Sequence, residues 1–303
     1  MKLLALLLAL SALYYVPKPS FVNQKALLNH FFYWLDHYFN GGKSSHALII
    51  WLLGALLPAF LVGLLSIYFQ KVHVLLGLVF SIFLLYVTLD FSNFGVKQKK
   101  IADALAANNI AELLNIDKDS FVNEHKLESS NVNQIASVSI AYFFRNAHYG
   151  LFALITWFFV FGAAGLVLFS LSFLLLKNTN ETNAYAKMSR SIFTALDWLP
   201  SYLTATCFAV VGDFEDAVYC WRTQLDDCTN KTFANILASG AGALEVKLDL
   251  TLLPLENGIS QELGIGDLAD NDYLKSAVGL VWRGLILLLG SLFLLAFAHF
   301  LGS

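Results

Sequence analysis

Long runs of apolar residues without a charged side chain constrain this chain more than any other feature. A bilayer core is about 30 Å thick and takes about 20 helical residues to cross. Ala47–Phe69 is 23 residues long and Leu151–Leu176 is 26, and neither contains a charge. Val72–Leu89 is likewise free of Asp, Glu, Lys and Arg, and Leu285–Leu301 carries only His299. Four transmembrane helices are therefore predicted.

Two further apolar segments are less regular. Met1–Val16 has the charged start and apolar middle of a signal peptide, but it lacks a convincing cleavage site. We expect it to be a retained, short membrane segment. Ile192–Val211 contains Asp197 and Pro200, whose polar groups are costly in lipid unless protein covers them. We expect an interfacial or re-entrant helix there in preference to a full crossing.

The composition agrees with a membrane protein, since 57% of the residues are hydrophobic and only 14% are charged, whereas soluble domains are about 25% charged. The predicted fold class is an all-α, polytopic helical membrane protein. It has the four transmembrane helices, one or two short or re-entrant segments, and mostly helical polar loops. We expect one membrane domain over 1–303, with a polar helical loop at 91–150 and an acidic polar loop at 212–279.

The distribution of charge predicts orientation and partners. Basic residues gather in Pro17–His46 and Phe91–Gly150, two spans apart, whereas the turn between those spans has Lys71 alone. Because cytoplasmic loops are enriched in Lys and Arg, both basic segments are placed in the cytoplasm of a bacterium, with the chain crossing the inner membrane several times. The net charge of -3 leaves no dense basic stripe for nucleic acid. The lipid bilayer is the expected partner.

Sequence motifs of known chemistry are missing. We find no P-loop, HExxH, GxSxG or dinucleotide fingerprint. The three cysteines fit neither a disulfide framework nor a zinc site. The acidic loop has no EF-hand spacing, so no catalytic residue, metal site or cofactor is predicted. His30 and His37 would share a helical face with Trp34 and Tyr38 nearby, which indicates an amphipathic helix at the membrane surface.

Two segments resemble a known family. They are Arg145–Leu171, with Trp157, Phe158, Gly162 and Gly165, and Ala195–Val218, with the LDWLP element. Both are similar to the AmpE proteins and to the superfamily that AmpE shares with CobD/CbiB, the adenosylcobinamide-phosphate synthases. The resemblance implies a helical inner-membrane protein. For the AmpE branch it implies a regulatory or sensory role linked to cell-wall status and β-lactamase induction signalling.

The enzyme branch of this superfamily carries a pattern like E-N-x-x-D-G-x-x-A-P-x-x-W, where this chain reads RNAHYGLFALITW. Arg145 stands in place of the glutamate, Tyr149 in place of the aspartate and Leu154 in place of the proline. Acidic groups would serve a ligase in magnesium binding or proton transfer, so their replacement favours a non-enzymatic role. A cobalamin-biosynthesis synthase remains the alternative, and transport is a third hypothesis.

Six residues are candidates for ligand binding. Asp197 lies within an apolar run, where an ionisable side chain is a functional hypothesis by default, with Arg145 or Arg190 as possible partners. The alternative is helix capping or a structural ion pair. We predict a pocket between Asp197, Asn146 and His148. The full set is Arg145, Asn146, His148, Asp197, Trp198 and Asp213. The implied partner is a small molecule derived from the cell wall or another membrane protein.

Overall fold

The computed structural model describes residues 2–15, 31–35, 38–39, 43–89, 103, 131–177, 184–226, 228–253, 259 and 262–302, without the side chains of 14, 44, 299 and 300. The predicted loop 91–150 is thus seen mainly from Asn131 onward, and His30 and His37 lie outside the described residues. Judged by its internal contacts, the chain forms two compact units. Unit 1 comprises 1–92 and 153–198, and unit 2 comprises 93–152 and 199–303.

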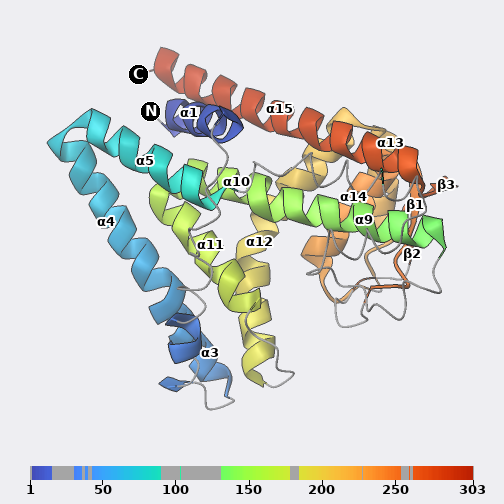
Figure 1. The fold of residues 1–303 in the computed structure, drawn as a ribbon, viewed down its shortest axis with the longest axis horizontal. Coiled ribbons are helices and arrows are strands. Elements are labelled where there is room, and N and C mark those ends of the chain that lie inside the picture. Colours follow the sequence, from blue (N-terminus) through green and yellow to red (C-terminus); the bar gives the residue numbers. More distant parts are fainter. Residues whose placement is uncertain are drawn as a thin grey trace. The chain divides into compact units, whose positions relative to one another are not determined.

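Unit 1 is a bundle of apolar helices (Figure 1). Its elements are α1 (Lys2–Tyr15), α3 (Ser44–Trp51), the π-helical turn η1 (Leu52–Leu56), α4 (Leu57–Val72), α5 (Val74–Thr88), α10 (Ala153–Phe161), α11 (Ala163–Lys177) and the first part of α12 (Ala184–Val211). At His73 the chain turns from α4 to α5. The Nδ1 atom of His73 accepts a hydrogen bond from the backbone N–H of Leu75 at 3.2 Å, which caps α5.

Two of the predicted spans correspond to helices that are long and apolar enough to cross a bilayer. They are Ser45–Val72 and Asn271–Ala298, judged by length and composition within the described residues. Helix α5 has 15 residues, about 22 Å, and is shorter than the bilayer core. The 26-residue run Leu151–Leu176 is not one helix, because Gly162 has φ +64 and separates α10 from α11. Two candidate spans therefore stand where four were predicted.

The end of α10 is stabilised by the N-terminal helix. The ammonium group of Lys2 donates to the carbonyl oxygens of Phe159 at 2.9 Å and Val160 at 3.4 Å, which have no helical partner beyond the break. One face of α1 is buried through Ala5, Leu6, Ala9 and Leu13. Helix α1 is thus part of the packing of unit 1.

Helix α12 continues through Pro200 as one 28-residue helix. Proline has no N–H, so the carbonyl oxygen of Leu196 lacks its usual helical donor. The indole Nε1 of Trp157 donates to this oxygen instead, at 3.3 Å. Trp157 therefore supplies the hydrogen-bond donor that Pro200 of the LDWLP element lacks.

This contact predicts the effect of Trp157→Phe. The substitution keeps an aromatic ring and removes the donor. We therefore expect the free energy of unfolding to fall by about 0.5–1.5 kcal/mol, measured by thermal unfolding in detergent. In a Pro200→Ala background the restored N–H can reach the Leu196 carbonyl, and the loss should shrink. An equal loss in both backgrounds would contradict this account.

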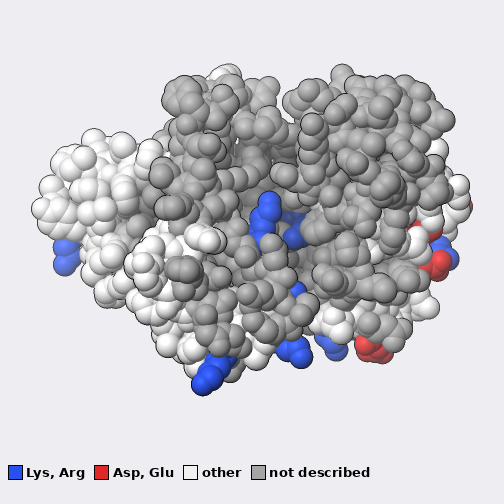
Figure 2. Space-filling model, turned by 60° about the horizontal axis from the view of Figure 1, so that its bottom comes forward, with Lys and Arg blue, Asp and Glu red and all other residues white. Residues whose placement is uncertain are grey.

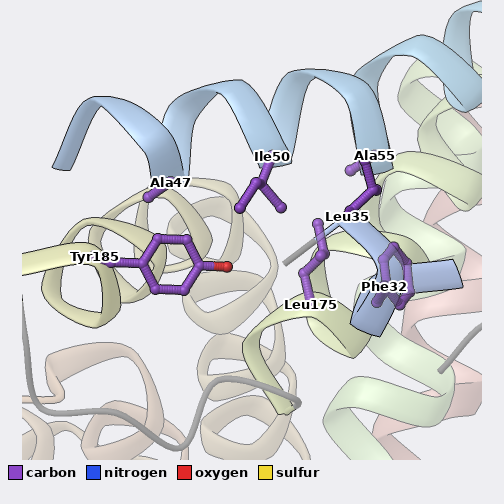
Figure 3. Close-up of a cluster of buried hydrophobic side chains, with 7 residues drawn as sticks. All are labelled: Phe32, Leu35, Ala47, Ile50, Ala55, Leu175 and Tyr185. Atoms are coloured by element: carbon purple, nitrogen blue, oxygen red, sulfur yellow. The ribbon is translucent and has the colours of Figure 1, made fainter. Parts of the chain in front are cut away.

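A buried cluster joins five elements of unit 1 (Figure 3). Phe32 and Leu35 come from the segment 31–35, and both are 2% exposed. The other members are Ala47 and Ile50 of α3, Ala55 of η1, Leu175 of α11 and Tyr185 of α12. Beside the cluster, the Trp51 indole donates to the Ser172 hydroxyl at 2.9 Å. Through the buried cluster, the segment 31–35 packs on α3 and η1.

Unit 2 combines helices with a small sheet. Its elements are α9 (Val132–Ala147), the π-helical turn η2 (His148–Phe152), the second part of α12, α13 (Phe214–Thr223), α14 (Lys231–Ala243), β1 (Val246–Asp249), β2 (Glu262–Leu263), β3 (Asp267–Leu268) and α15 (Asn271–Gly302). The sheet has the order β2-β1-β3, with β1 antiparallel to β2 and parallel to β3. The all-α prediction is therefore corrected to mostly helical, since strands of two to four residues leave little periodicity to recognise.

Asp249 connects this sheet to α9. Its carboxylate accepts from Gln134 Nε2 at 3.0 Å and from Thr251 Oγ1 at 2.6 Å. Burial raises the pKa of the Asp249 carboxyl, but the hydrogen bonds from Thr251 and Gln134 and the charge of Lys247 outweigh it, so the pKa lies below its usual value.

The lowered pKa of Asp249 predicts acid sensitivity. An ionised Asp249 stabilises the folded state at pH above the unfolded value of about 3.9, and this contribution is lost as pH falls through the lower folded pKa. In thermal melts from neutral to acidic pH, Asp249→Asn should therefore lose less stability on acidification than the parent protein. If the melting temperatures of the two proteins fell equally on acidification, the prediction would be refuted.

Candidate functional site

The predicted residues Arg145, Asn146 and His148 lie in unit 2 where α9 passes into η2. Helix α9 begins with a capping box, in which the backbone N–H of Asn131 donates to Gln134 Oε1 at 3.1 Å. A π-helical turn inserts an extra residue into the helical ladder and is frequent at functional sites. Within this stretch His148 is fully buried, whereas Asn146 is exposed.

His148 belongs to a buried polar chain. Its Nδ1 lies 2.8 Å from the hydroxyl of Thr204, and that hydroxyl donates to the carbonyl of Pro200 at 2.9 Å. A threonine hydroxyl has one hydrogen, so the Nδ1 of His148 is the donor to Thr204 and carries the proton. The hydrogen bonds thus select the Nδ1-protonated tautomer and hold the ring against α12.

The guanidinium of Arg145 lies close to two aromatic rings. Its guanidinium carbon is 5.9 Å from the centre of the Tyr149 ring and 5.6 Å from that of Phe233 on α14. Both distances are within the range of cation–π attraction. Burial lowers the pKa of the Arg145 guanidinium, which nevertheless stays charged at neutral pH. The charged guanidinium of Arg145 is therefore partly desolvated and lies beside aromatic rings.

Asn235 is a residue that the sequence analysis missed. It lies on α14, is 2% exposed, and neither its Oδ1 nor its Nδ2 has a hydrogen-bond partner within the described structure. One turn further along α14, the Ser239 hydroxyl donates to the carbonyl of Ala205 at 2.7 Å, so this face of α14 packs on α12. The available signal was a lone amide in the otherwise small and apolar run Phe233–Ala243.

A second polar centre in unit 2 contains Asp213, the last candidate of this unit. Carboxylate oxygens of Asp213, Asp216 and Glu245 lie within 4.8 Å of one another. Asp213 also caps α13 by accepting from the backbone N–H of Asp216 at 2.9 Å. Three carboxylates at this spacing could hold a divalent cation, for which hard oxygen ligands are preferred. No metal site was predicted, because Glu245 is remote from the two aspartates in the sequence.

Two of these residues, Asp213 and Glu245, line an open cavity of about 380 Å³. Arg283 and Tyr273 of α15 also line it, so acidic, cationic and phenolic groups share one solvent-accessible space. Nearby on α13, burial together with the charge of Asp216 raises the pKa of the Cys220 thiol to about 11. The cavity can accept a polar ligand with groups of either charge.

The remaining candidates belong to unit 1. Asp197 is fully buried, in accord with its place in an apolar run, whereas Trp198 is 58% exposed. Arg145, Asn146, His148 and Asp213 all lie in unit 2. The pocket predicted among Asp197, Asn146 and His148 stays a prediction.

Comparison with known proteins identifies the family. Residues 44–244 match the family model described as regulatory signalling modulator protein AmpE. A protein of Stutzerimonas stutzeri (strain A1501) named cobalamin biosynthesis protein CobD is 30% identical over 275 residues, which is 84% of this chain and 87% of that protein. A protein of the same name from Chromobacterium violaceum is 32% identical over 123 residues, 38% of each chain.

No solved structure matches this chain. The resemblance read from Arg145–Leu171 and Ala195–Val218 is confirmed, because both segments lie within the matched residues. The family and the two candidate spans indicate a membrane protein. The chain belongs to the AmpE family, within the superfamily that includes the CobD proteins.

Proposed function

We propose that this protein is a multi-pass regulator or sensor of the bacterial inner membrane, acting in signalling that links cell-wall status to β-lactamase induction. The observation that carries the proposal is the AmpE match over 44–244, together with Arg145 and Tyr149 at positions where the related ligases have acids. The signal would be a small molecule derived from the cell wall or a membrane protein partner. Nucleic acid is not expected to bind.

The surface of the described residues supports the membrane part of the proposal. Exposed large apolar side chains follow α4 and α5, among them Phe60, Leu64, Leu75 and Phe83, each at least 50% exposed. Continuous apolar exposure of this kind is rare on soluble proteins. On the face in Figure 2 most of the described surface is uncharged, and Lys and Arg side chains lie singly or in small groups. We propose four crossings. Two are the candidate spans Ser45–Val72 and Asn271–Ala298, and the other two are formed by α5 and by the α10–α11 pair.

The test of the regulatory role is genetic. In a host with inducible β-lactamase, deletion of the gene should change induction by a cell-wall antibiotic, and the wild-type gene should restore it. Arg145→Ala should fail to restore it, whereas Arg145→Lys, which keeps the charge but not the planar guanidinium near Tyr149 and Phe233, should restore it partly. The parent strain must produce the protein at its normal level. If induction is the same in that strain and in its deletion mutant, the regulatory role loses its support.

A synthase of the CobD type is the second candidate. It is favoured by the identity of 30% over 84% of the chain and by the carboxylates Asp213, Asp216 and Glu245, which could hold the magnesium that a nucleotide-dependent ligase needs. Expression in a strain that lacks adenosylcobinamide-phosphate synthase tests it. Restored cobalamin synthesis by the wild type would establish the activity, and failure by stably produced protein would exclude it.

Asp213→Asn is the matched variant for this experiment. Asparagine can still accept the Asp216 N–H at the start of α13, so the cap is kept while the charge is removed. If the carboxylates hold a catalytic cation, this variant should be folded and inactive. Full activity of Asp213→Asn would separate any synthase activity from the carboxylates.

A further inference from the structure

The described residues 31–35 and 38–39 present exposed aromatic side chains that the regulatory role does not explain. Tyr33 is 70% exposed, Trp34 48% and Tyr38 67%. The rings of Phe31 and Trp34 stack with centres 6.5 Å apart, and those of Trp34 and Tyr38 are 5.1 Å apart. Phe31, Tyr33, Trp34 and Tyr38 are called the aromatic face below. Such rings combine an apolar body with, in Trp and Tyr, a polar tip.

Two buried side chains attach the segment 31–35 to the candidate span Ser45–Val72 of unit 1. Phe32 and Leu35 point into the buried cluster with Ile50 and Ala55 (Figure 3). A Cβ atom at Gly54 would lie 3.2 Å from Leu35 Cδ1 and 3.3 Å from Phe32 Cε1. The absence of a side chain at Gly54 therefore admits the segment, which packs on the span at the level of η1.

The boundary of the hydrocarbon core near the N-terminal end of the span Ser45–Val72 can be estimated without reference to the aromatic face. Ser45–Val72 has 28 residues and is about 42 Å long, so it exceeds the hydrocarbon core by about 12 Å. Its other end is the polar turn formed by Gln70, Lys71 and His73, where Lys71 is exposed. Counting about 20 residues back from that turn reaches the neighbourhood of Trp51. This position is within one helical turn of Gly54, where the segment 31–35 packs.

We infer that the aromatic face lies in the glycerol and headgroup region of a phospholipid bilayer and sets one boundary of the hydrocarbon core near Trp51–Gly54. Trp and Tyr are enriched at this depth in membrane proteins. Exposed apolar side chains continue along the span from this level, with Leu57 at 48%, Phe60 at 59% and Leu61 at 56%. Phe60 is about 15 Å from Gln70 along the helix and so lies at the centre of the core. The inference needs unit 1 to be in a bilayer and is independent of the regulatory role.

The test measures depth directly. An environment-sensitive fluorophore is attached to Tyr33→Cys, to Trp34→Cys and, as the control, to Phe60→Cys in the full chain in phosphatidylcholine vesicles. Cys207, Cys220 and Cys228 are buried, and unsubstituted protein reports any labelling of them. Vesicles contain lipids with a nitroxide either near the headgroup or deep in the acyl chain.

At positions 33 and 34 the shallow nitroxide should quench at least about twofold more than the deep one, and at Phe60→Cys the order should reverse. Stronger quenching by the deep nitroxide, or by aqueous iodide alone, at both aromatic positions would overturn the inference. If Phe60→Cys were also reached only by iodide, membrane insertion of this span would fail as well. The two failures are therefore distinguishable.

Discussion

Replacing Gly264 with alanine should destabilise unit 2 by about 3–5 kcal/mol. Gly264 has φ +92, and a Cβ atom there would lie 2.1 Å from the carbonyl oxygen of Val246 in β1. Movement away from this clash would break two hydrogen bonds to Gln224, whose Oε1 accepts from the Gly264 N–H at 2.7 Å and whose Nε2 donates to the Gly264 carbonyl at 3.1 Å. The strain and the hydrogen-bond loss therefore act together.

Gly279→Ala is the matched control for Gly264→Ala. Gly279 lies in α15, and a Cβ atom there meets nothing within 4 Å. Alanine is a better helix former than glycine by about 0.5–1 kcal/mol, so this variant should be neutral or slightly more stable. Thermal unfolding of both variants in detergent gives the comparison. Equal melting temperatures would show that the sheet does not constrain Gly264 as described.

Asn235→Leu should make the protein more stable and impair its function. A buried amide without hydrogen bonds costs about 1–3 kcal/mol relative to an apolar side chain of similar shape, so its removal should raise the stability by that amount. Proteins keep such a group where function needs it, at the expense of stability. The β-lactamase induction assay should therefore show loss of restoration by a protein with a higher melting temperature.

Ser239→Ala provides the contrast on the same helix face. It deletes the hydrogen bond to the Ala205 carbonyl, so a loss of about 1 kcal/mol is expected. Opposite signs for the two substitutions would identify Asn235 as the unsatisfied group. A loss of stability in Asn235→Leu similar to that in Ser239→Ala would show that a polar partner, such as buried water, stabilises the amide in the folded protein.

The helical character and the family could be predicted from the sequence, because both are carried by local patterns. The uncharged runs Ala47–Phe69 and Leu285–Leu301 lie largely within candidate spans of the structure. The RNAHYG and LDWLP segments identified the AmpE family correctly. Helix formation and apolar burial depend on residues a few positions apart, so the chain itself contains this information.

Three features depended on tertiary structure. The break at Gly162 arises where α10 and α11 pack closely, because a Cβ at Gly165 would lie 2.3 Å from the Trp157 carbonyl. Glu245 joins Asp213 and Asp216 only when α13 packs on α14, which needs glycine at position 242.

The unpartnered state of Asn235 is the third feature, and it was invisible because hydrogen-bond partners are set by the neighbouring elements and not by the residues beside it in the chain. Local sequence thus determined the helices and the kinship. The polar centres were decided by packing between segments far apart in the chain, which no local pattern encodes.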